Sequence, residues 1–215
     1  MLEFCAKLLI GYLAGSLVGS LVLGRIRGTD IRQLGSGNAG GTNALRTQGK
    51  GFALGVMIID IAKVVAPILW LSDAALPGIG VDPDVSRETI AAGIAAGAVL
   101  GHVWPLYFGL RGGKGMATLL GAYGAIEPWL LLAVVLSWVP VFLLRGYVGL
   151  ATICATALAP VWLALAGQAG RPLFWFALFM AGFVAWTHRG NIARMRAGTE
   201  SRMFAGRRRP SGPQR

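Results

Sequence analysis

Charged residues and cysteines are scarce in this chain. Charged side chains make up 13% of the 215 residues, about half of the roughly 25% that soluble globular domains carry. The hydrophobic share is 55%, so the composition predicts an integral membrane protein. The two cysteines, Cys5 and Cys154, both lie in apolar stretches, which predicts two buried hydrophobic side chains and no disulfide.

Several chemical signatures are also missing. The chain has no G-x-S-x-G sequence, no cysteine near a polar stretch, and only 2 histidines. Neither a covalent acyl-enzyme nor a metal-assisted mechanism therefore finds support in the sequence. We expect no metal site and no other cofactor.

Acidic residues are outnumbered, with 9 Asp and Glu against 20 Lys and Arg and a net charge of +11. In a membrane protein such an excess first sets orientation and attracts anionic lipid. The arginines border apolar segments instead of forming a soluble basic face. We therefore expect membrane lipid, and no nucleic acid, as a partner.

Seven apolar segments follow one another along the chain. They cover residues 8–23, 52–71, 89–100 with an extension toward His102, 117–126, 129–144, 147–166 and 173–187. A helix needs about 20 apolar residues to cross a bilayer, so segment 117–126 is short. Glu127 and Pro128 follow it. A turn there gives seven spans, whereas one helix through both residues gives six.

The positive-inside rule separates these two topologies. With seven spans and an outside N-terminus, sixteen of the 20 Lys and Arg face the cytoplasm; the others are Lys7, Lys63, Arg87 and Arg171. With six spans, the arginine-rich end would lie opposite the glycine-rich loops. We predict an all-α integral membrane protein of about seven transmembrane helices, one of them short, with a cytoplasmic C-terminus. Residues 1–200 form this domain, and 201–215 form a basic, disordered cytoplasmic tail.

Two glycine-rich polar stretches, residues 35–46 and 109–118, interrupt the apolar pattern. The first contains G-x-G-x-x-G, but a dinucleotide site would need a preceding strand and a βαβ unit. The second is not a P-loop, because Phe108 stands at the first glycine position and Gly115 follows Lys114. Backbone N–H groups beside a lysine still predict a phosphate site. The short helix that follows Gly115 would point its N-terminal N–H groups at the anion.

A third polar stretch begins at His188. Asn191 and Arg194 follow at helical spacing, so the three side chains share one face and suit acid–base chemistry and phosphate binding. His102 looks like a helix terminus that orients the second stretch. Asp60 and Lys63, three residues apart in the second span, should face the bundle interior. A structural ion pair and a substrate contact are equally open for them.

Together the stretches resemble the bacterial acylphosphate-dependent glycerol-3-phosphate acyltransferases, the PlsY family. The resemblance covers about residues 8–200 and rests on three motifs. These are 35–43 with Arg46, 101–105 continuing to 112–118, and 188–191 with Arg194 and 198–200. Small departures from the family pattern are Gly41, Val64, Trp104, Leu110 and Arg111.

The resemblance implies transfer of an acyl group from acyl phosphate to the 1-hydroxyl of sn-glycerol 3-phosphate, giving lysophosphatidic acid and phosphate. It also implies a bacterial cytoplasmic (inner) membrane and possible contact with the enzyme that makes acyl phosphate. The implied catalytic residues are Ser36, Lys114, His188 and Asn191. The implied substrate-binding residues are Gly37, Asn38, Thr42, Asn43, Arg46, Gly112, Gly113, Gly115 and Arg194. Whether His188 or the substrate's own phosphate takes the hydroxyl proton is open.

Two hypotheses from other classes remain. A transporter for phosphorylated metabolites would use similar anion-binding loops and would explain Asp60 and Lys63 as a relay. The polar groups cluster on one face and no inverted repeat is visible, which argues against it. A non-catalytic membrane anchor for a lipid-synthesis complex is the third hypothesis.

Overall fold

The computed structural model describes residues 1–203 of the chain, and within them the secondary structure is helical. The α-helices are α1 (Leu2–Gly15), α2 (Gly19–Ile26), α3 (Gly41–Gln48), α4 (Lys50–Leu71), α5 (Arg87–Val103), α6 (Met116–Ile126), α7 (Pro128–Arg145), α8 (Val148–Leu165), α9 (Pro172–Thr187) and α10 (Arg189–Arg196). Short 3₁₀ turns occupy Ile31–Gln33 and Leu106–Phe108. Most of the predicted tail, residues 204–215, lies outside the described residues. Just before it, the Met203 amide donates to the Gly146 carbonyl at 2.9 Å.

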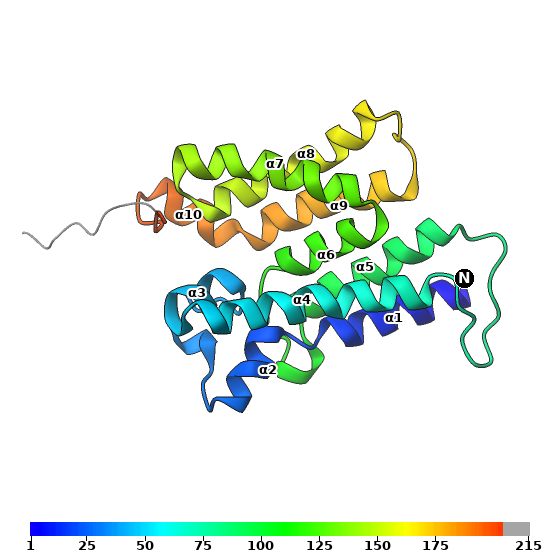
Figure 1. Cartoon of the computed structure of the whole chain (residues 1–215), viewed down its shortest axis with the longest axis horizontal. Helices are drawn as coiled ribbons and strands as arrows, with labels where there is room; N and C mark the ends of the chain where they lie inside the picture. Colours follow the sequence, from blue (N-terminus) through cyan, green and yellow to red (C-terminus); the bar gives the residue numbers. More distant parts are fainter. Residues whose placement is uncertain (204–215) are drawn as a thin grey trace, which may run out of the picture.

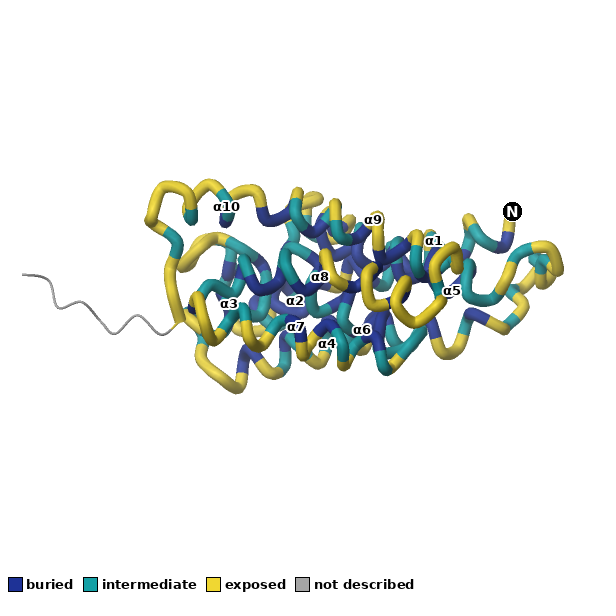
Figure 2. Tube along the Cα trace, turned by 90° about the horizontal axis from the view of Figure 1, so that it is seen from above, coloured by how far each residue is buried: buried dark blue, intermediate teal, exposed yellow. Residues whose placement is uncertain are grey.

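The long helices lie side by side along the longest axis of the molecule (Figure 1). Helices α1, α4 and α5 form one layer, α7, α8 and α9 form the other, and α6 lies between them, against α4, α5 and α7. The core runs along the middle, and exposed residues concentrate at the two ends (Figure 2). Helices α2, α3 and α10 gather at one end, and the N-terminus and the 72–86 loop lie at the other.

Four stretches in the described residues are long and apolar enough to cross a membrane, namely α4, α7, α8 and Arg87–Phe108, which comprises α5 and the 3₁₀ turn after it. The bent pair α1 and α2 makes a fifth candidate, while α6 and α9 are shorter apolar helices. The turn predicted at Glu127 and Pro128 is present, because α6 ends at Ile126 and α7 begins at Pro128. By length and composition these helices give four or five candidate spans, and the count of seven stays a prediction.

The first predicted span, residues 8–23, is wrong as a single helix. Helix α1 ends at Gly15 and α2 begins at Gly19, with a 41° bend between them. The break frees backbone groups that would be costly to leave unpaired in an apolar environment. Asp60 Oδ1 accepts from the Gly19 amide at 3.0 Å, and Lys63 Nζ donates to the Leu17 carbonyl at 3.4 Å.

Asp60 and Lys63 face the bundle interior, as predicted, and are 1% and 8% exposed. Their side chains also pair with each other, with Lys63 Nζ 2.8 Å from Asp60 Oδ1. The pair therefore has a structural task that the spacing alone did not reveal. From α4, Asp60 supplies an acceptor and Lys63 a donor to the backbone at the break between α1 and α2.

A second network of charged residues lies at the end of the bundle that carries the N-terminus and the 72–86 loop. Glu3 and Lys7 of α1 are 2% and 0% exposed and pair at 2.6 Å. Arg87, at the start of α5, approaches Glu3 Oε1 to 2.7 Å, and the Asp82 amide donates to Glu3 Oε2 at 2.7 Å. This network fixes α1 against α5 and ties down the 72–86 loop, far from the end where α2, α3 and α10 gather.

Glycines let α1 and α5 approach each other closely. A Cβ added to Gly15 would lie 2.1 Å from the Ala98 carbonyl oxygen, and one added to Gly101 would lie 2.1 Å from the Tyr12 oxygen. Gly15 thus serves the close packing of α1 on α5. Gly19 packs instead on α4, where an added Cβ would lie 2.8 Å from the Val56 oxygen.

Gly15→Val is expected to lower the free energy of unfolding by about 3 kcal/mol, because the added methyl groups must push α1 away from α5. Gly182→Val is the matched control, since no heavy atom lies within 4 Å of a Cβ added to that glycine of α9. Thermal unfolding in detergent micelles measures both variants. Equal melting temperatures for the two would contradict the close contact.

Candidate active site

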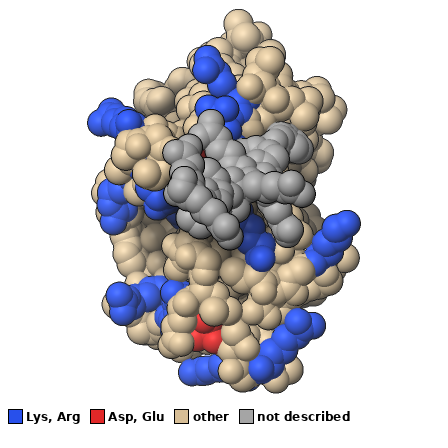
Figure 3. Space-filling model, turned by 90° about the vertical axis from the view of Figure 1, so that its left-hand side faces the viewer, with Lys and Arg blue, Asp and Glu red and all other residues tan. Residues whose placement is uncertain are grey.

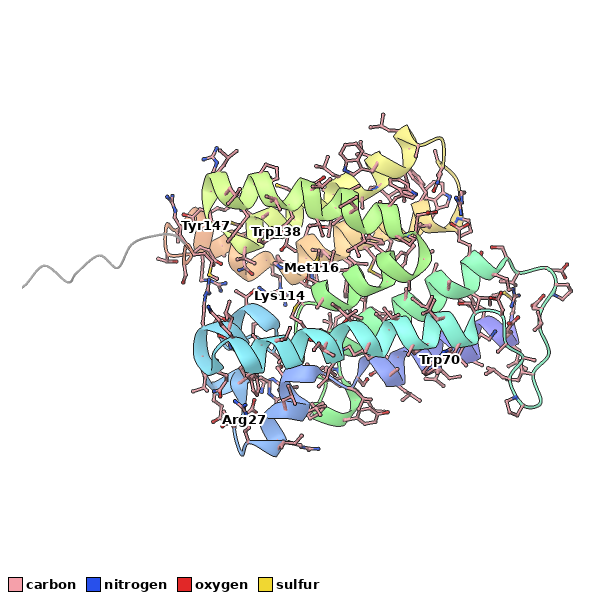
Figure 4. All side chains as sticks on the ribbon, in the orientation of Figure 1. Arg27, Trp70, Lys114, Met116, Trp138 and Tyr147 are labelled. Atoms are coloured by element: carbon pink, nitrogen blue, oxygen red, sulfur yellow. The ribbon has the colours of Figure 1, made fainter. Side chains whose placement is uncertain are left out.

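The three polar stretches meet at the end of the molecule that carries α2, α3 and α10. They enclose a cavity of about 550 Å³. Eleven predicted site residues line it: Ser36, Gly37, Asn38, Thr42, Asn43, Arg46, Lys114, Gly115, His188, Asn191 and Arg194. Lys and Arg side chains surround this end, with little acidic surface between them (Figure 3). Lys114 and Met116 lie between the two helix layers (Figure 4).

The first stretch contains a short helix that the sequence did not predict. Helix α3 begins at Gly41, and its N-cap Gly40 and its first residues Gly41 and Thr42 line the cavity. Glycine is a poor helix former, so Gly40 and Gly41 concealed this start. Helix α6 also opens on the cavity, as predicted, through Met116 and Ala117. Two helix N-termini therefore present N–H groups to the same space, which favours an anion.

Asn43 braces the first stretch from inside. Its side chain is 1% exposed. Oδ1 accepts from the Ser36 amide at 2.9 Å, and Nδ2 donates to the carbonyls of Leu34 and Ile31 at 2.9 and 3.2 Å. These bonds hold the Ser36 backbone in place at the cavity. Although Asn43 lines the cavity, its amide is used within the loop.

Gly112 and Gly113 differ from the expectation that their N–H groups hold phosphate. These groups donate instead to the carbonyls of Val103 and His102, both at 3.1 Å. A Cβ at Gly112 would lie 2.0 Å from the His102 oxygen. The loop thus lies directly on the end of α5, and these glycines serve close packing. His102 does orient this loop through its carbonyl, in agreement with the sequence interpretation.

Lys114 begins a chain of polar contacts across the cavity. Its ammonium group donates to Asn191 Oδ1. Asn191 Nδ2 donates to Glu200 Oε1 at 2.7 Å, and Glu200 Oε2 accepts from Arg194 Nε at 2.6 Å. Burial, followed by the nearby Arg194 charge, lowers the pKa of Lys114 to about 8.

Glu200 was not among the predicted site residues, although it belongs to the third motif. It lines the cavity and joins Asn191 to Arg194. The signal in the sequence was its position shortly after a face that already carried Asn191 and Arg194. A single acidic residue in a basic segment could equally have formed an ion pair at the surface. Only the contacts show that Glu200 belongs to the cavity.

His188 lies between α9 and α10 and is 5% exposed. Its Nδ1 lies 2.8 Å from the Val184 carbonyl oxygen. Because a carbonyl can only accept, Nδ1 carries the proton, and Nε2 of the neutral ring keeps its lone pair. Burial, followed by the Lys114 charge, lowers the pKa of His188 to about 4. The imidazole is therefore neutral near pH 7 and can accept a hydrogen bond.

The cavity continues from the polar end into an apolar cleft. Helices α4, α6, α7 and α8 contribute side chains to it. Its apolar lining includes Met57, Met116, Leu120, Val134, Val135, Trp138 and Val148. Trp138 Nε1 donates to Thr152 Oγ1 at 3.2 Å, which fixes the indole ring against α8. The arrangement can hold a molecule that has an anionic head and an apolar chain.

A family model described as glycerol-3-phosphate acyltransferase matches residues 5–198. This chain belongs to that family. The glycerol-3-phosphate acyltransferase of Aquifex aeolicus (strain VF5) is 38% identical over 194 residues, which cover 90% of this chain and 96% of the relative. That of Anaeromyxobacter sp. (strain Fw109-5) is 36% identical over 197 residues, covering 90% and 93%.

Members of the family have also been solved as crystal structures. PlsY, an integral membrane glycerol 3-phosphate acyltransferase, in its glycerol 3-phosphate form superimposes with a TM-score of 0.80 at 32% identity. The superposition covers 93% of this chain and 94% of PlsY. The lysophosphatidic acid form gives 0.78. The shared fold and the apolar helices identify this family member as a multi-pass membrane protein.

Proposed function

We propose that this protein transfers an acyl group from acyl phosphate to the 1-hydroxyl of sn-glycerol 3-phosphate. The products are lysophosphatidic acid and inorganic phosphate. The observation that carries the proposal is that two helix N-termini, Lys114, Arg46 and Arg194 share one cavity with an apolar cleft. Such a cavity suits two phosphates and one fatty chain. Family membership supports the same reaction, because PlsY was crystallised in glycerol 3-phosphate and lysophosphatidic acid forms.

Recognition of the two phosphates is divided among the cations and the helix starts. Lys114 and Arg46 neutralise phosphoryl oxygens and reduce the repulsion between the two anionic substrates. Ser36 and Thr42 donate hydroxyl hydrogen bonds beside the N-terminus of α3. Arg194 adds charge from α10, and Glu200 fixes its guanidinium through the 2.6 Å contact.

His188 and Asn191 orient the attacking hydroxyl. In the reaction, the hydroxyl oxygen attacks the acyl carbonyl carbon, the bond from that carbon to the phosphate oxygen breaks, and phosphate leaves. The hydroxyl proton must go to a base. A pKa of about 4 makes His188 a weaker base than a phosphate oxygen, whose pKa in a monoester is about 6. The departing phosphate therefore takes the proton, while His188 Nε2 accepts the hydrogen bond that directs the hydroxyl.

An assay on purified protein tests this function. Protein in detergent, supplied with acyl phosphate and glycerol 3-phosphate, should release phosphate and lysophosphatidic acid in equal amounts. A transporter would give no product under these conditions. An anchor would give none either, or would show the same background after Lys114→Ala. Either result would overturn the proposal.

The pH dependence provides a second check. Lys114 is charged below its pKa of about 8 and neutral above it, so kcat/KM should fall as the pH rises through about 8. Lys114→Arg keeps the positive charge over this range and should move the alkaline limb upward, even if its overall rate is lower. If the alkaline limb of kcat/KM fell at the same pH in the wild-type protein and in Lys114→Arg, the titration would belong to another group.

We further propose seven spans with the N-terminus outside and the cavity facing the cytoplasm of a bacterial inner membrane. Asp84 lies in the 72–86 loop and Arg145 lies at the cavity end of α7. In a variant without native cysteines, a membrane-impermeant maleimide should label Asp84→Cys in intact spheroplasts. It should label Arg145→Cys only after lysis. The reverse pattern would invert the topology.

A further inference from the structure

His102 has a polar atom that finds no hydrogen-bond partner among residues 1–203. The residue lies in the last turns of α5, is 2% exposed, and lines the cavity. Its Nδ1 lies 2.8 Å from Lys63 Nζ. An ammonium group can only donate, so Nδ1 accepts, and the neutral ring must carry its proton on Nε2. Within residues 1–203, no group accepts a hydrogen bond from that Nε2.

The free Nε2 faces the glycine loop that precedes α6. A Cβ added to Gly113 would lie 2.3 Å from it, so the ring edge lies directly beside the backbone that leads to Lys114. Helix α6 begins three residues after Gly113. The donor is therefore held where the Lys114 loop and the start of α6 favour an anion.

Neighbouring charges allow an anion to approach this side of the ring. Asp60 Oδ1 lies 3.3 Å from Nδ1, on the other side of the imidazole, and Lys63 pairs with it at 2.8 Å. Lys63 thus compensates the negative charge of Asp60. His102 lines the cavity, so an oxygen of a ligand bound there can supply the acceptor that Nε2–H lacks.

We propose that His102 is a further substrate-binding residue, whose Nε2–H donates to a phosphoryl oxygen bound beside the Lys114 loop. Lys63 and Asp60 act as positioning residues, because they fix the tautomer and the orientation of the ring. The inference rests on the proposed function for the nature of its ligand. Both glycerol 3-phosphate and acyl phosphate carry the phosphoryl group, so separate measurements with each substrate identify which one His102 holds.

Steady-state kinetics provides the first test. His102→Phe keeps a buried ring but removes the donor, and the KM of one phosphate substrate should rise about 10- to 100-fold, as expected for loss of a hydrogen bond to a charged group. The kcat should change much less. His102→Gln carries an amide donor at a similar reach and should recover most of the affinity. Thr118→Val is the control, because it removes a hydroxyl group 3.4 Å from Nδ1 of the same ring and leaves Nε2–H in place. Both KM values should stay unchanged in this variant.

Nitrogen NMR tests the same contact without turnover. The chain has 2 histidines, so ¹⁵N-histidine labelling gives few signals, and His102→Gln assigns them. Nε2 of His102 should appear as a protonated nitrogen that shifts when glycerol 3-phosphate or inorganic phosphate is added, but not with glycerol. This readout decides the question even if His102→Phe fails to fold.

The outcomes separate the two proposals. If the wild-type protein has no acyltransferase activity, the proposed function fails, while a phosphate-dependent shift of Nε2 would still support an anion site at His102. If the wild-type protein is active, two results would overturn the role of His102. One is unchanged KM values for both substrates in His102→Phe, and the other is an unprotonated Nε2.

Discussion

Lys114→Met is expected to lower kcat/KM for acyl transfer by roughly 10³-fold, which is the upper range for removing one preorganised donor from a reacting oxyanion. Methionine keeps much of the length of the lysine side chain but removes its charge and its hydrogen bonds. The loss should be this large because Lys114 lies where the second and third stretches meet, in contact with Asn191. Initial rates of phosphate release, measured over a range of both substrates, provide the value.

Lys50→Met is the matched control for this result. Lys50 is an exposed lysine at the start of α4, at the same end of the molecule, and it does not line the cavity. The same chemical change there should leave kcat/KM within about twofold, as is usual for surface substitutions. Similar losses in both variants would mean that the net charge of this end matters, rather than a contact made by Lys114.

Replacement of His188 should separate hydrogen bonding from proton transfer. His188→Phe removes the acceptor and is expected to reduce kcat by about 100-fold, the loss typical of a reacting group displaced by about 1 Å. His188→Gln can still accept a hydrogen bond but cannot take up a proton near neutral pH. We expect it to stay within about 10-fold of the wild-type kcat, because the departing phosphate takes the proton.

The opposite hypothesis makes a clear counter-prediction. If His188 were the general base, His188→Gln and His188→Phe would lose activity to the same extent, by about 10²- to 10⁴-fold. Melting temperatures of both variants provide the control for folding, since His188 Nδ1 also ties the end of α9 through the Val184 carbonyl. Equal losses with normal melting temperatures would exclude the phosphate as the base.

The sequence alone determined the class of the protein and most helix boundaries. Segment 117–126 was predicted within one residue of α6, and the turn at Glu127 and Pro128 was correct. These features depend on local properties, namely the length of apolar runs and residues that interrupt a helix. The three polar stretches were also visible locally, and their residue patterns were sufficient to indicate the family.

The tertiary structure decided how the polar residues are used. Asp60 and Lys63 were recognised as inward-facing, but only the packed helices show that they pair with backbone groups near Leu17 and Gly19, more than 40 positions away. The break in the first span was missed for this reason, because the groups that compensate it are distant in sequence, whereas the start of α3 was hidden by the low helix propensity of Gly40 and Gly41.

The glycine-rich stretches show this division most clearly. Composition predicted N–H groups around a phosphate, yet the N–H groups of Gly112 and Gly113 donate to α5. The cavity depends instead on the starts of α3 and α6 and on side chains from α5 and α10. A sequence specifies which groups can hold an anion, because that is a property of each residue. Which of them are free to do so depends on the partners that folding gives to the others.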